Sequence, residues 1–544
     1  MPPAFTRENV GRRLESGAYV VKRDRMIGRI VWLVACVLAP ALVFALAAHG
    51  ADLRIGMAAD VGSMDPHFAN ISPNVAVSSH VFETLTTVDA DARLIPGLAE
   101  SWQAIDPTTW EFRLRRGVRF HDGSELTAAD VLFSLDRPAT IKNSPGGFTT
   151  FTRPIVAKEA VDRYTVRLHT ARPYAMVPYD LVSVFIVSKH AAQHARSQDF
   201  DNGTAMIGTG PYRFVRFARG EAIDLVRSES YWGARPAWQH VSLRLIPSDP
   251  ARIAALLAGD VDMIENVPPA DASMLSRDTR YRIERKVSWR TIFLTLDQYR
   301  NDSPFVHAPA NAPNPLRDPR VRRAISKAID REAICSKVMD GFATPTANIV
   351  APSVFGHAPE LKAEAYDSDG ARALLAQAGY ANGFELTIQG PNNRYINDEL
   401  IVQAVAQMLA RVGIRAQVQT MPVNVYFPKA RAQSFSVALL GWGSFSGDLA
   451  LRSLFMTENA QQGTGTWNWG RYSNPEVDEL VRQALGALDN TTREALTRKA
   501  TIQAMHDEAI IPLYHQIASW ALRKDLRYVA RTDEFSFAFD VHPQ

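Results

Sequence analysis

The feature that most constrains the fold is a strand, a helix and a second strand that follow one another between residues 383 and 420. FELTIQG has the composition of a strand, LIVQAVAQMLARVG is typical of a helix ended by Gly413, and IRAQVQT again indicates a strand. Such a βαβ unit requires parallel pairing and a right-handed crossover. A helix-like stretch at 424–433 then leads to a third strand, FSVALLGW. The pattern predicts an α/β fold with a parallel sheet.

The loops that follow the first and third strands are expected at one rim of that sheet. Open α/β sheets bind ligands at this rim, beyond the carboxyl ends of their strands. The first loop carries Asn392, Asn393, Arg394 and Tyr395, and the second is GWGSFSGD, at 441–448. We therefore expect the two loops to face one cleft.

Other elements are marked by clear start signals. TWEFRLRRGVRF, at 109–120, alternates apolar and charged residues like a half-buried strand. Thr127 and Asp130 form a capping-box pattern that predicts a helix. Three more helices are predicted where Asp or Asn precedes a proline, at 248–259, 317–329 and 473–485. Their arginine-rich faces are expected to be solvated surface.

The N-terminal region has the composition of an export signal. The uncharged run from Ile30 to Ala48 follows the basic stretch KRDRMIGR and ends in small residues. This arrangement predicts a signal peptide cleaved near Ala47 to Ala51, with Met26 as an alternative start to Met1. An uncleaved anchor is the competing interpretation, because the run is nearly long enough to span a bilayer.

Length and charge restrict the function further. At 544 residues the chain exceeds one usual core, so two or more lobes are expected. The whole chain has a formal charge of +3, but residues 1–51 hold seven basic and three acidic residues, which leaves about −1 for the rest. A nucleic-acid partner is therefore not expected. Without the leader, Cys335 is the single cysteine, so no intramolecular disulfide is predicted.

Sequence motifs for cofactors and metals are weak. The chain contains no Gly-Lys dipeptide, so a Walker A loop is not possible and any ATP-driven step belongs to another protein. His190 and His194 have the spacing of a helical metal pair, but no third ligand is evident. We predict no cofactor and no metal.

A serine hydrolase is an alternative suggested by GSFSG, at 443–447. It has serines between two glycines, as the Gly-x-Ser-x-Gly turn of those enzymes does, and Ser446 is the candidate nucleophile. The hydrolase order requires a histidine downstream, and only His506, His515 and His542 follow.

Five stretches closely resemble the family 5 extracellular solute-binding proteins, which are receptors of ABC importers for oligopeptides, dipeptides and glutathione. They are LIPGLAESWQAIDPTTWEFRLRRGVRFHDGSELTAADVLFSLDR (94–137), IGTGPYRFVRFARGEAIDLVRSESYWG (207–233), LRDPRVRRAISKAIDREAI (316–334), RYSNPEVDELVRQAL (471–485) and IPLYHQIASWALRK (511–524). They follow one another in the family's order over nearly the whole chain after the leader.

The resemblance implies a two-lobe periplasmic binding protein of type II, in the large three-domain form, with a hinge between its lobes. After the leader at 1–51, the first lobe is expected to be discontinuous, an inserted small domain lies within it, and a second lobe follows. The expected bounds are 52–84, 205–295 and 508–544 for lobe I, 85–204 for the inserted domain and 296–507 for lobe II.

The resemblance also implies a solute site at the rim. In the peptide-binding branches, an aspartate that follows the Gly-Trp pair after two residues binds the free α-amine of the peptide, whereas this chain has Phe445 there. The missing aspartate argues against ordinary dipeptides and oligopeptides and favours a modified peptide, an opine-like amino-acid conjugate or another small polar solute. GWGS...GD looks closer to the glutathione-type branch.

Each candidate ligand-binding residue has an expected role. Trp442 and Phe445 would form an apolar wall, and Ser444 and Ser446 would form hydrogen bonds. Asp448 would meet a cationic group or cap the next helix. Arg394, flanked by Asn393 and Tyr395, would bind a carboxylate.

The resemblance implies binding without catalysis. A monomer in the periplasm would deliver its solute to a permease in the inner membrane, whose ATPase subunits are separate chains. An uncleaved leader would instead make the chain a membrane-anchored solute sensor.

Overall fold

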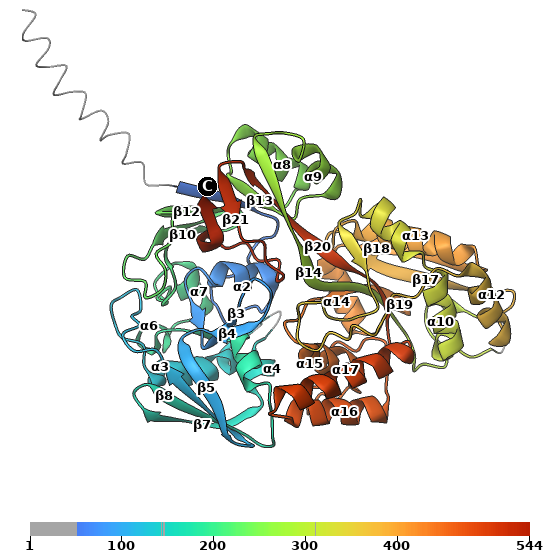
Figure 1. Ribbon diagram of the computed structural model, residues 1–544, viewed down its shortest axis with the longest axis horizontal. Helices are drawn as coiled ribbons and strands as arrows, with labels where there is room; N and C mark the ends of the chain where they lie inside the picture. The colour runs from blue at the N-terminus through green and yellow to red at the C-terminus, as the bar shows by residue number, and fades with distance from the viewer. Residues whose placement is uncertain (1–51, 143, 145–146, 310–311) are drawn as a thin grey trace, which may run out of the picture. The chain divides into compact units, whose positions relative to one another are not determined.

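Two long antiparallel strands lie at the centre of a twelve-stranded sheet in the computed structural model. The structure describes residues 52–142, 144, 147–309 and 312–544, and the predicted signal peptide lies outside them. The two strands are β14 (Tyr281–Leu296) and β20 (Ile511–Arg523), which run side by side in Figure 1. Their pairing is irregular between Val287 and Thr291 and again between Ile292 and Phe293.

His515 lies within β20 and links it to neighbouring segments. Its two ring nitrogens lie 3.0 Å from the hydroxyls of Thr291, in β14, and Thr346. Burial lowers the pKa of His515 to about 3, so the ring is neutral and one nitrogen accepts while the other donates.

On one side of the central pair, the sheet continues through β13, β1, β12, β11 and β10. Strand β1 is parallel to both of its neighbours, and α8 and α9 pack against this half. The bounds are β1 (Asp52–Met57), β10 (Tyr212–Ala218), β11 (Ala222–Arg227), β12 (His240–Leu245), α8 (Asp249–Ala258), β13 (Met263–Glu265) and α9 (Pro269–Leu275).

On the other side lie the strands of the predicted βαβ unit. Strand β17 pairs in parallel with both β18 and β19, and α13 packs on β17 and β18, as predicted. The bounds are β15 (Val306–His307), α10 (Pro319–Ala328), α11 (Arg331–Ala333), β16 (Ala343–Pro345), α12 (Ser368–Gln377), β17 (Phe384–Pro391), α13 (Asp398–Ala410), β18 (Ile414–Met421), α14 (Val423–Arg431) and β19 (Val437–Trp442).

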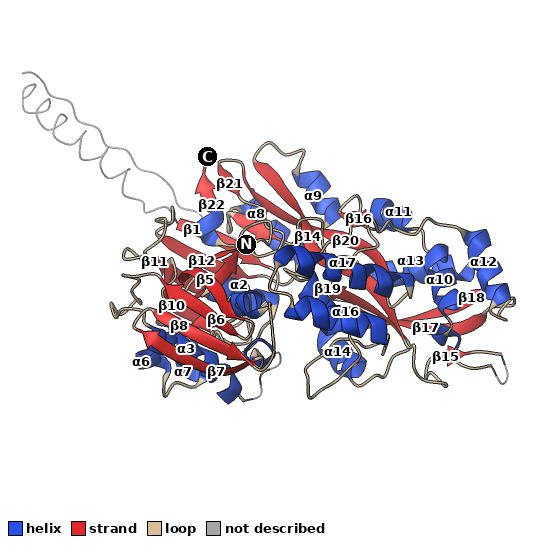
Figure 2. Ribbon diagram, turned by 60° about the horizontal axis from the view of Figure 1, so that its bottom comes forward, coloured by secondary structure: helices blue, strands red, loops and turns tan. Residues whose placement is uncertain are grey.

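A separate four-stranded antiparallel sheet, in the order β5, β6, β8, β7, carries α3 on it (Figure 2). The predicted half-buried strand is β6, which ends at Leu114, and Thr127 and Asp130 form the predicted capping box of α3. The bounds of this region are α2 (Ser72–Ser78), β2 (Glu83–Thr84), β3 (Thr86–Val88), β4 (Leu94–Pro96), β5 (Ala99–Asp106), β6 (Thr109–Leu114), α3 (Ala128–Asp136), α4 (Thr149–Thr152), β7 (Ile155–Asp162), β8 (Thr165–Thr170), α5 (Val177–Asp180), β9 (Phe185–Ile186), α6 (Lys189–Ala192) and α7 (Ser197–Asp201).

The last third of the chain adds helices and returns to the first half of the sheet. Helix α17 packs against α16 and α15, and the chain then enters β20. The bounds are α15 (Gly447–Ala450), α16 (Pro475–Gly486), α17 (Asn490–His506), β21 (Leu526–Tyr528) and β22 (Val541–Pro543).

The three proline-started helices form as predicted, as α8, α10 and α16, but the expectation for their arginines was wrong in part. Arg252 and Arg322 are buried. The Arg322 guanidinium donates to the backbone carbonyls of Leu316, Arg317, Asp507 and Glu508. Arginine has five N–H donors, so it can satisfy several unpaired carbonyls at once. These two side chains therefore fasten helices to neighbouring segments instead of facing water.

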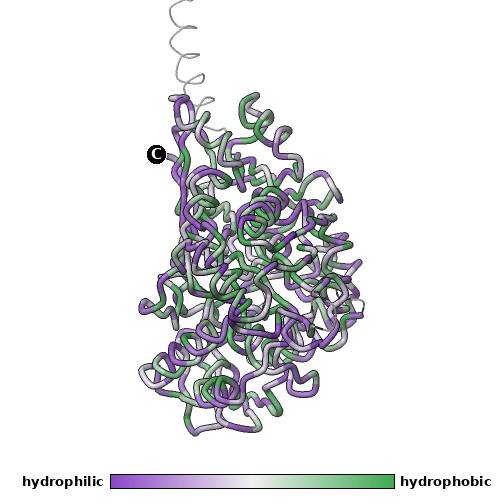
Figure 3. The backbone as a smooth tube through the Cα atoms, turned by 90° about the vertical axis from the view of Figure 1, so that its right-hand side faces the viewer, coloured by the Kyte–Doolittle hydropathy of each residue, from purple (hydrophilic) through white to green (hydrophobic). Residues whose placement is uncertain are grey.

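Hydropathy alternates along the chain in short stretches (Figure 3). The buried apolar side chains form several separate clusters, as the length of the chain predicts. Within the described residues, no helix is both long enough and apolar enough to cross a membrane.

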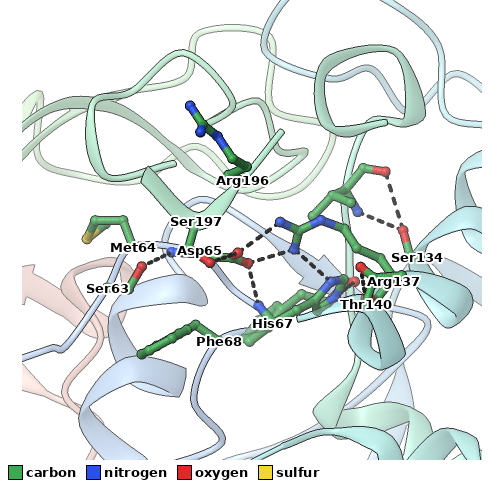
Figure 4. A network of polar contacts seen from close by, with 12 residues as sticks. Ser63, Met64, Asp65, His67, Phe68, Ser134, Arg137, Thr140, Arg196 and Ser197 are labelled. Atoms are coloured by element: carbon green, nitrogen blue, oxygen red, sulfur yellow. Dashed lines mark hydrogen bonds and ion pairs between the residues drawn. The ribbon is translucent and has the colours of Figure 1, made fainter. Parts of the chain in front are cut away.

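A buried ion pair joins the segment after β1 to α3. Arg137 donates to both carboxylate oxygens of Asp65, at 2.6 and 2.8 Å, and the side chains are 3% and 0% exposed (Figure 4). Asp65 also accepts from the Ser197 hydroxyl and the His67 amide. Both oxygens of the Asp65 carboxylate therefore have hydrogen-bond partners within the fold.

Replacing Arg137 by alanine should destabilise the protein strongly, because it leaves Asp65 buried without its charge partner. The expected loss is about 3–5 kcal/mol in the free energy of unfolding, measured by urea denaturation. Arg163→Ala is the control, since it removes a pair with Glu125 that is largely exposed and should cost about 1 kcal/mol or less. Similar losses in both variants would show that the Asp65 pair does not anchor α3.

Candidate ligand-binding site

The segment GWGSFSGD follows the end of β19 and leads into α15. Two of its glycines are required by close packing. A Cβ on Gly443 would lie 2.5 Å from the Trp289 indole nitrogen, and a Cβ on Gly447 would lie 2.9 Å from Thr497. Any side chain there would force its neighbours to move. The glycines thus let the backbone approach Trp289 and α17.

The comparison of this segment with the hydrolase turn was wrong. The Gly-x-Ser-x-Gly motif has its serine in the middle, and the middle residue of GSFSG is Phe445. Ser446 is 0% exposed, and its hydroxyl donates to Asp448 and caps α15 by accepting from the Asp448 amide. No histidine bonds to it in the described part of the chain, and His515 is engaged by Thr291 and Thr346. The structure gives the hydrolase alternative no support.

Asp448 lies in the first turn of α15 and is completely buried. Its carboxylate receives the hydroxyls of Ser446 and Thr497 and forms an ion pair with Arg493, whose Nε is 3.2 Å away. Burial raises the pKa of Asp448, and the Arg493 charge opposes that rise. The carboxylate thus has internal partners on both oxygens.

Arg493, from the amino-terminal part of α17, was not identified in the sequence. Its guanidinium packs against two aromatic rings, 4.6 Å from the centroid of Tyr179 and 4.1 Å from that of Phe355. The side chain is 3% exposed, and neither its Nε nor its Nη2 has a hydrogen-bond partner among the described residues. The hydrogen-bonding capacity of this buried cation is therefore not fully used within the described structure.

A cavity of about 430 Å³ opens beside Arg493. The residues of its wall come from segments distant in sequence, and they include Arg93, Trp102, Tyr179, Phe355, Phe445 and Arg493. Phe445 stacks on Tyr179 with a ring separation of 6.5 Å. Within the described chain, the residues around this cavity include two arginines and no aspartate or glutamate. Volume and lining suit a small solute with an apolar part and an anionic group.

The other predicted residues of the second loop lie around this cavity without lining it. Trp442 is half-buried and packs against Trp467, with ring centroids 5.4 Å apart. The Ser444 hydroxyl donates to the Ser446 carbonyl at 2.7 Å. Of the predicted site residues, only Phe445 borders the cavity.

The first loop meets the end of β19, as parallel pairing predicts. The Gly441 amide donates to the Tyr395 hydroxyl at 2.9 Å, and the Asn393 side chain accepts from the Val423 amide and so holds the start of α14. Arg394 lies over the Tyr395 ring, 5.6 Å from its centroid. Whether these side chains contact a solute stays a prediction.

Arg394 has a paired neighbour of the same charge. Arg290 forms a buried ion pair with Glu534 at 2.6 Å, whereas no ion pair of Arg394 is found within the described residues. Burial, followed by the nearby Arg290 charge, lowers the pKa of Arg394, although a guanidinium remains charged at neutral pH.

Few residues of the cavity wall could be predicted from patterns in the sequence. Tyr179 and Phe355 lie in short or irregular segments, where periodicity is uninformative. Arg493 offered one signal, because a cation near the amino end of a helix opposes the helix dipole. A cation at this position is expected to have a tertiary contact that compensates for the unfavourable interaction with the helix dipole.

The chain was compared with known proteins. The model of the "Bacterial extracellular solute-binding proteins, family 5 Middle" matches residues 93–462. Glutathione-binding protein GsiB of Pectobacterium atrosepticum is 28% identical over 481 residues, which cover 86% of this chain and 89% of that protein. GsiB of Escherichia coli K12 is 26% identical over 519 residues, covering 93% and 97%.

A solved structure has a similar fold. The ABC transporter-associated periplasmic binding protein DppA from Helicobacter pylori, in complex with the peptide STSA, is 25% identical and superposes with a TM-score of 0.77. The match covers 91% of this chain and 98% of that one.

Arg394→Ala should leave the stability of the ligand-free protein nearly unchanged, because it breaks no ion pair. We expect a change within about 1 kcal/mol, from the loss of the contact with Tyr395. Arg290→Ala is the matched comparison and should cost about 3–5 kcal/mol, because it leaves Glu534 unpaired. Urea denaturation measures both, and a large loss in Arg394→Ala would indicate that this arginine holds the fold instead of a solute.

Proposed function

Because the chain belongs to family 5 of the bacterial extracellular solute-binding proteins, we propose that it captures a small peptide-like or other polar solute for an ABC importer. The α/β fold of a type II periplasmic binding protein, expected from the sequence, is confirmed by the likeness to DppA. The cavity beside Phe445 and Arg493 is the observation that carries the proposal, since it is concave, combines apolar with polar surface and is lined from distant segments.

The export signal predicted from the sequence supports the same role. The predicted signal peptide would place the mature chain in the periplasm, beside the permease of the inner membrane. The ATPase subunits and the permease would be separate chains, and the receptor would act as a monomer without catalysis.

Hinge closure is proposed to trap the solute. The wall of the cavity includes Trp102 and Tyr179, in the predicted inserted domain, and Phe355 and Phe445, in predicted lobe II. A solute that contacts both parts stabilises the closed form over the open one.

The two long strands suggest where the hinge lies. Residues 291–296 of β14 pair with β19, although the predicted boundary placed 291–295 in lobe I. We therefore propose that the boundary falls at the irregular pairing between Val287 and Thr291, where β14 can bend.

Gentle purification followed by native mass spectrometry tests the proposal first. We expect the mature chain, from about residue 52, to carry a co-purified solute or to be stabilised by one in a thermal-shift panel. The panel holds peptides, glutathione and amino-acid conjugates, and the stabilisation should grow with RT ln(1 + [L]/Kd). A protein that is empty and unchanged by the whole panel would contradict the proposed function.

A parallel assay addresses catalysis. Hydrolysis of p-nitrophenyl acetate should remain at the background rate in the wild type and in Ser446→Ala alike, because Ser446 is buried and lacks a base. Turnover lost in Ser446→Ala would favour the hydrolase.

A further inference from the structure

The charge balance of the cavity wall limits the solutes that it can hold. Arg93 and Arg493 lie in the wall, each within 4.0 Å of a carboxylate outside it, Asp91 and Asp448 respectively, and the described wall itself contains no carboxylate. The nearest carboxylate that sequence reasoning offered, Asp448, is fully buried and bonded to Ser446 and Thr497. An ammonium group in the cavity would therefore lose water without gaining a charge partner.

Arg493 is incompletely satisfied by the protein. Its Nε lies 3.2 Å from Asp448 in an ion pair, but neither Nε nor Nη2 has a hydrogen-bond partner in the described structure. Leaving charged donors unpaired in the interior is costly, so a carboxylate that reaches the guanidinium from the cavity would be favoured. The guanidinium also packs against the rings of Tyr179 and Phe355, which limits its movement.

The amino end of α17 adds little to the attraction for anions. The wall includes Asn490, the first residue of this seventeen-residue helix, but the preceding Asp489 carboxylate caps the helix by accepting from the Thr492 amide. The partial positive charge of this end is therefore already balanced, and the preference for an anion depends on Arg493.

Phe445 makes the cavity unfavourable for an amine, because its ring is not a carboxylate that could pair with an ammonium group. Its ring lies 6.5 Å from that of Tyr179 and 6.2 Å from that of Trp289. The wall at this point is apolar, so it suits a methyl, acyl or alkyl group.

We propose that the cavity selects its solute by a carboxylate bound to Arg493 and does not require a free α-amine. This inference rests on the proposed function and specifies its substrate class: organic acids whose amine is absent, acylated or alkylated, such as N-substituted amino acids and N-blocked peptides.

Three matched probes test the inference by isothermal titration. They are alanyl-phenylalanine, its N-acetyl derivative and its C-terminal amide. We expect the acetylated acid to bind at least as tightly as the free dipeptide, and the amide at least tenfold more weakly than the free dipeptide. An amide that binds as well as the acid, or an acetyl group that weakens binding tenfold, would overturn the inference and leave the proposed function standing. Failure of all three to bind to a protein that another member of the thermal-shift panel stabilises would overturn the inference alone, whereas failure of the whole panel would contradict the proposed function as well.

Substitutions assign the effect to Arg493. Arg493→Lys keeps a cation beside Asp448 but lacks the planar fork, and we expect it to bind the acetylated dipeptide at least tenfold more weakly. Arg498→Lys, on the same helix and paired with Glu494, is the control and should leave affinity unchanged. Equal affinity in wild type and a folded Arg493→Lys would overturn the assignment.

A second variant covers the case in which Arg493→Lys fails to fold. Phe445→Asp places a carboxylate where the ring lines the cavity, and it should reverse the preference, so that the free dipeptide binds better than its acetyl derivative. An unchanged preference in folded Phe445→Asp would place the solute elsewhere.

Discussion

The antiparallel pairing of β14 with β20 is the constraint on which the rest of this structure depends. The two halves of the main sheet are joined through these two strands, and they come from segments more than two hundred residues apart. The chain must therefore bring its last region back to its middle before either half of the sheet is complete. Pairings of such separation close large loops, and they gain their stability only when the flanking apolar residues are buried together. The buried faces of both strands meet that requirement.

The solute cavity follows from the same return of the chain. Helix α17, which carries Arg493, immediately precedes β20, and β19, which leads to Phe445, pairs with β14. The glycines at 443 and 447 then permit close contact between the loop after β19 and its neighbours, Trp289 and Thr497. The ion pair of Asp448 with Arg493 joins this loop to α17, while Nε and Nη2 of the guanidinium have no hydrogen-bond partner in the described structure. One side chain would thus serve both the fold and the proposed recognition of a solute.

Local patterns in the sequence predicted much of the fold and little of the cavity. The βαβ unit, the capping box of α3 and the proline-started helices all depend on periodicity and on cap chemistry, which act over a few residues. Arg322 was misjudged because its acceptors are backbone carbonyls, two of them nearly two hundred residues away, and no residue type marks them. Phe445 was predicted as a site residue because the resemblance to the family placed its position in the ligand-binding loop. Tyr179, Phe355 and Arg493 meet only through tertiary packing, so their grouping had no signal in the sequence.

The composition of the cavity wall has a consequence for how the protein can be observed. Trp102 and Trp110 both border the cavity, and the Trp110 indole donates to the Tyr174 carbonyl at 3.0 Å. Trp102 is half-buried and so lies partly in water. A solute that displaced this water from the proposed site would change the polarity around the indole, and with it the wavelength at which the ring emits. The emission of the protein's own tryptophans would then report occupancy without an added dye.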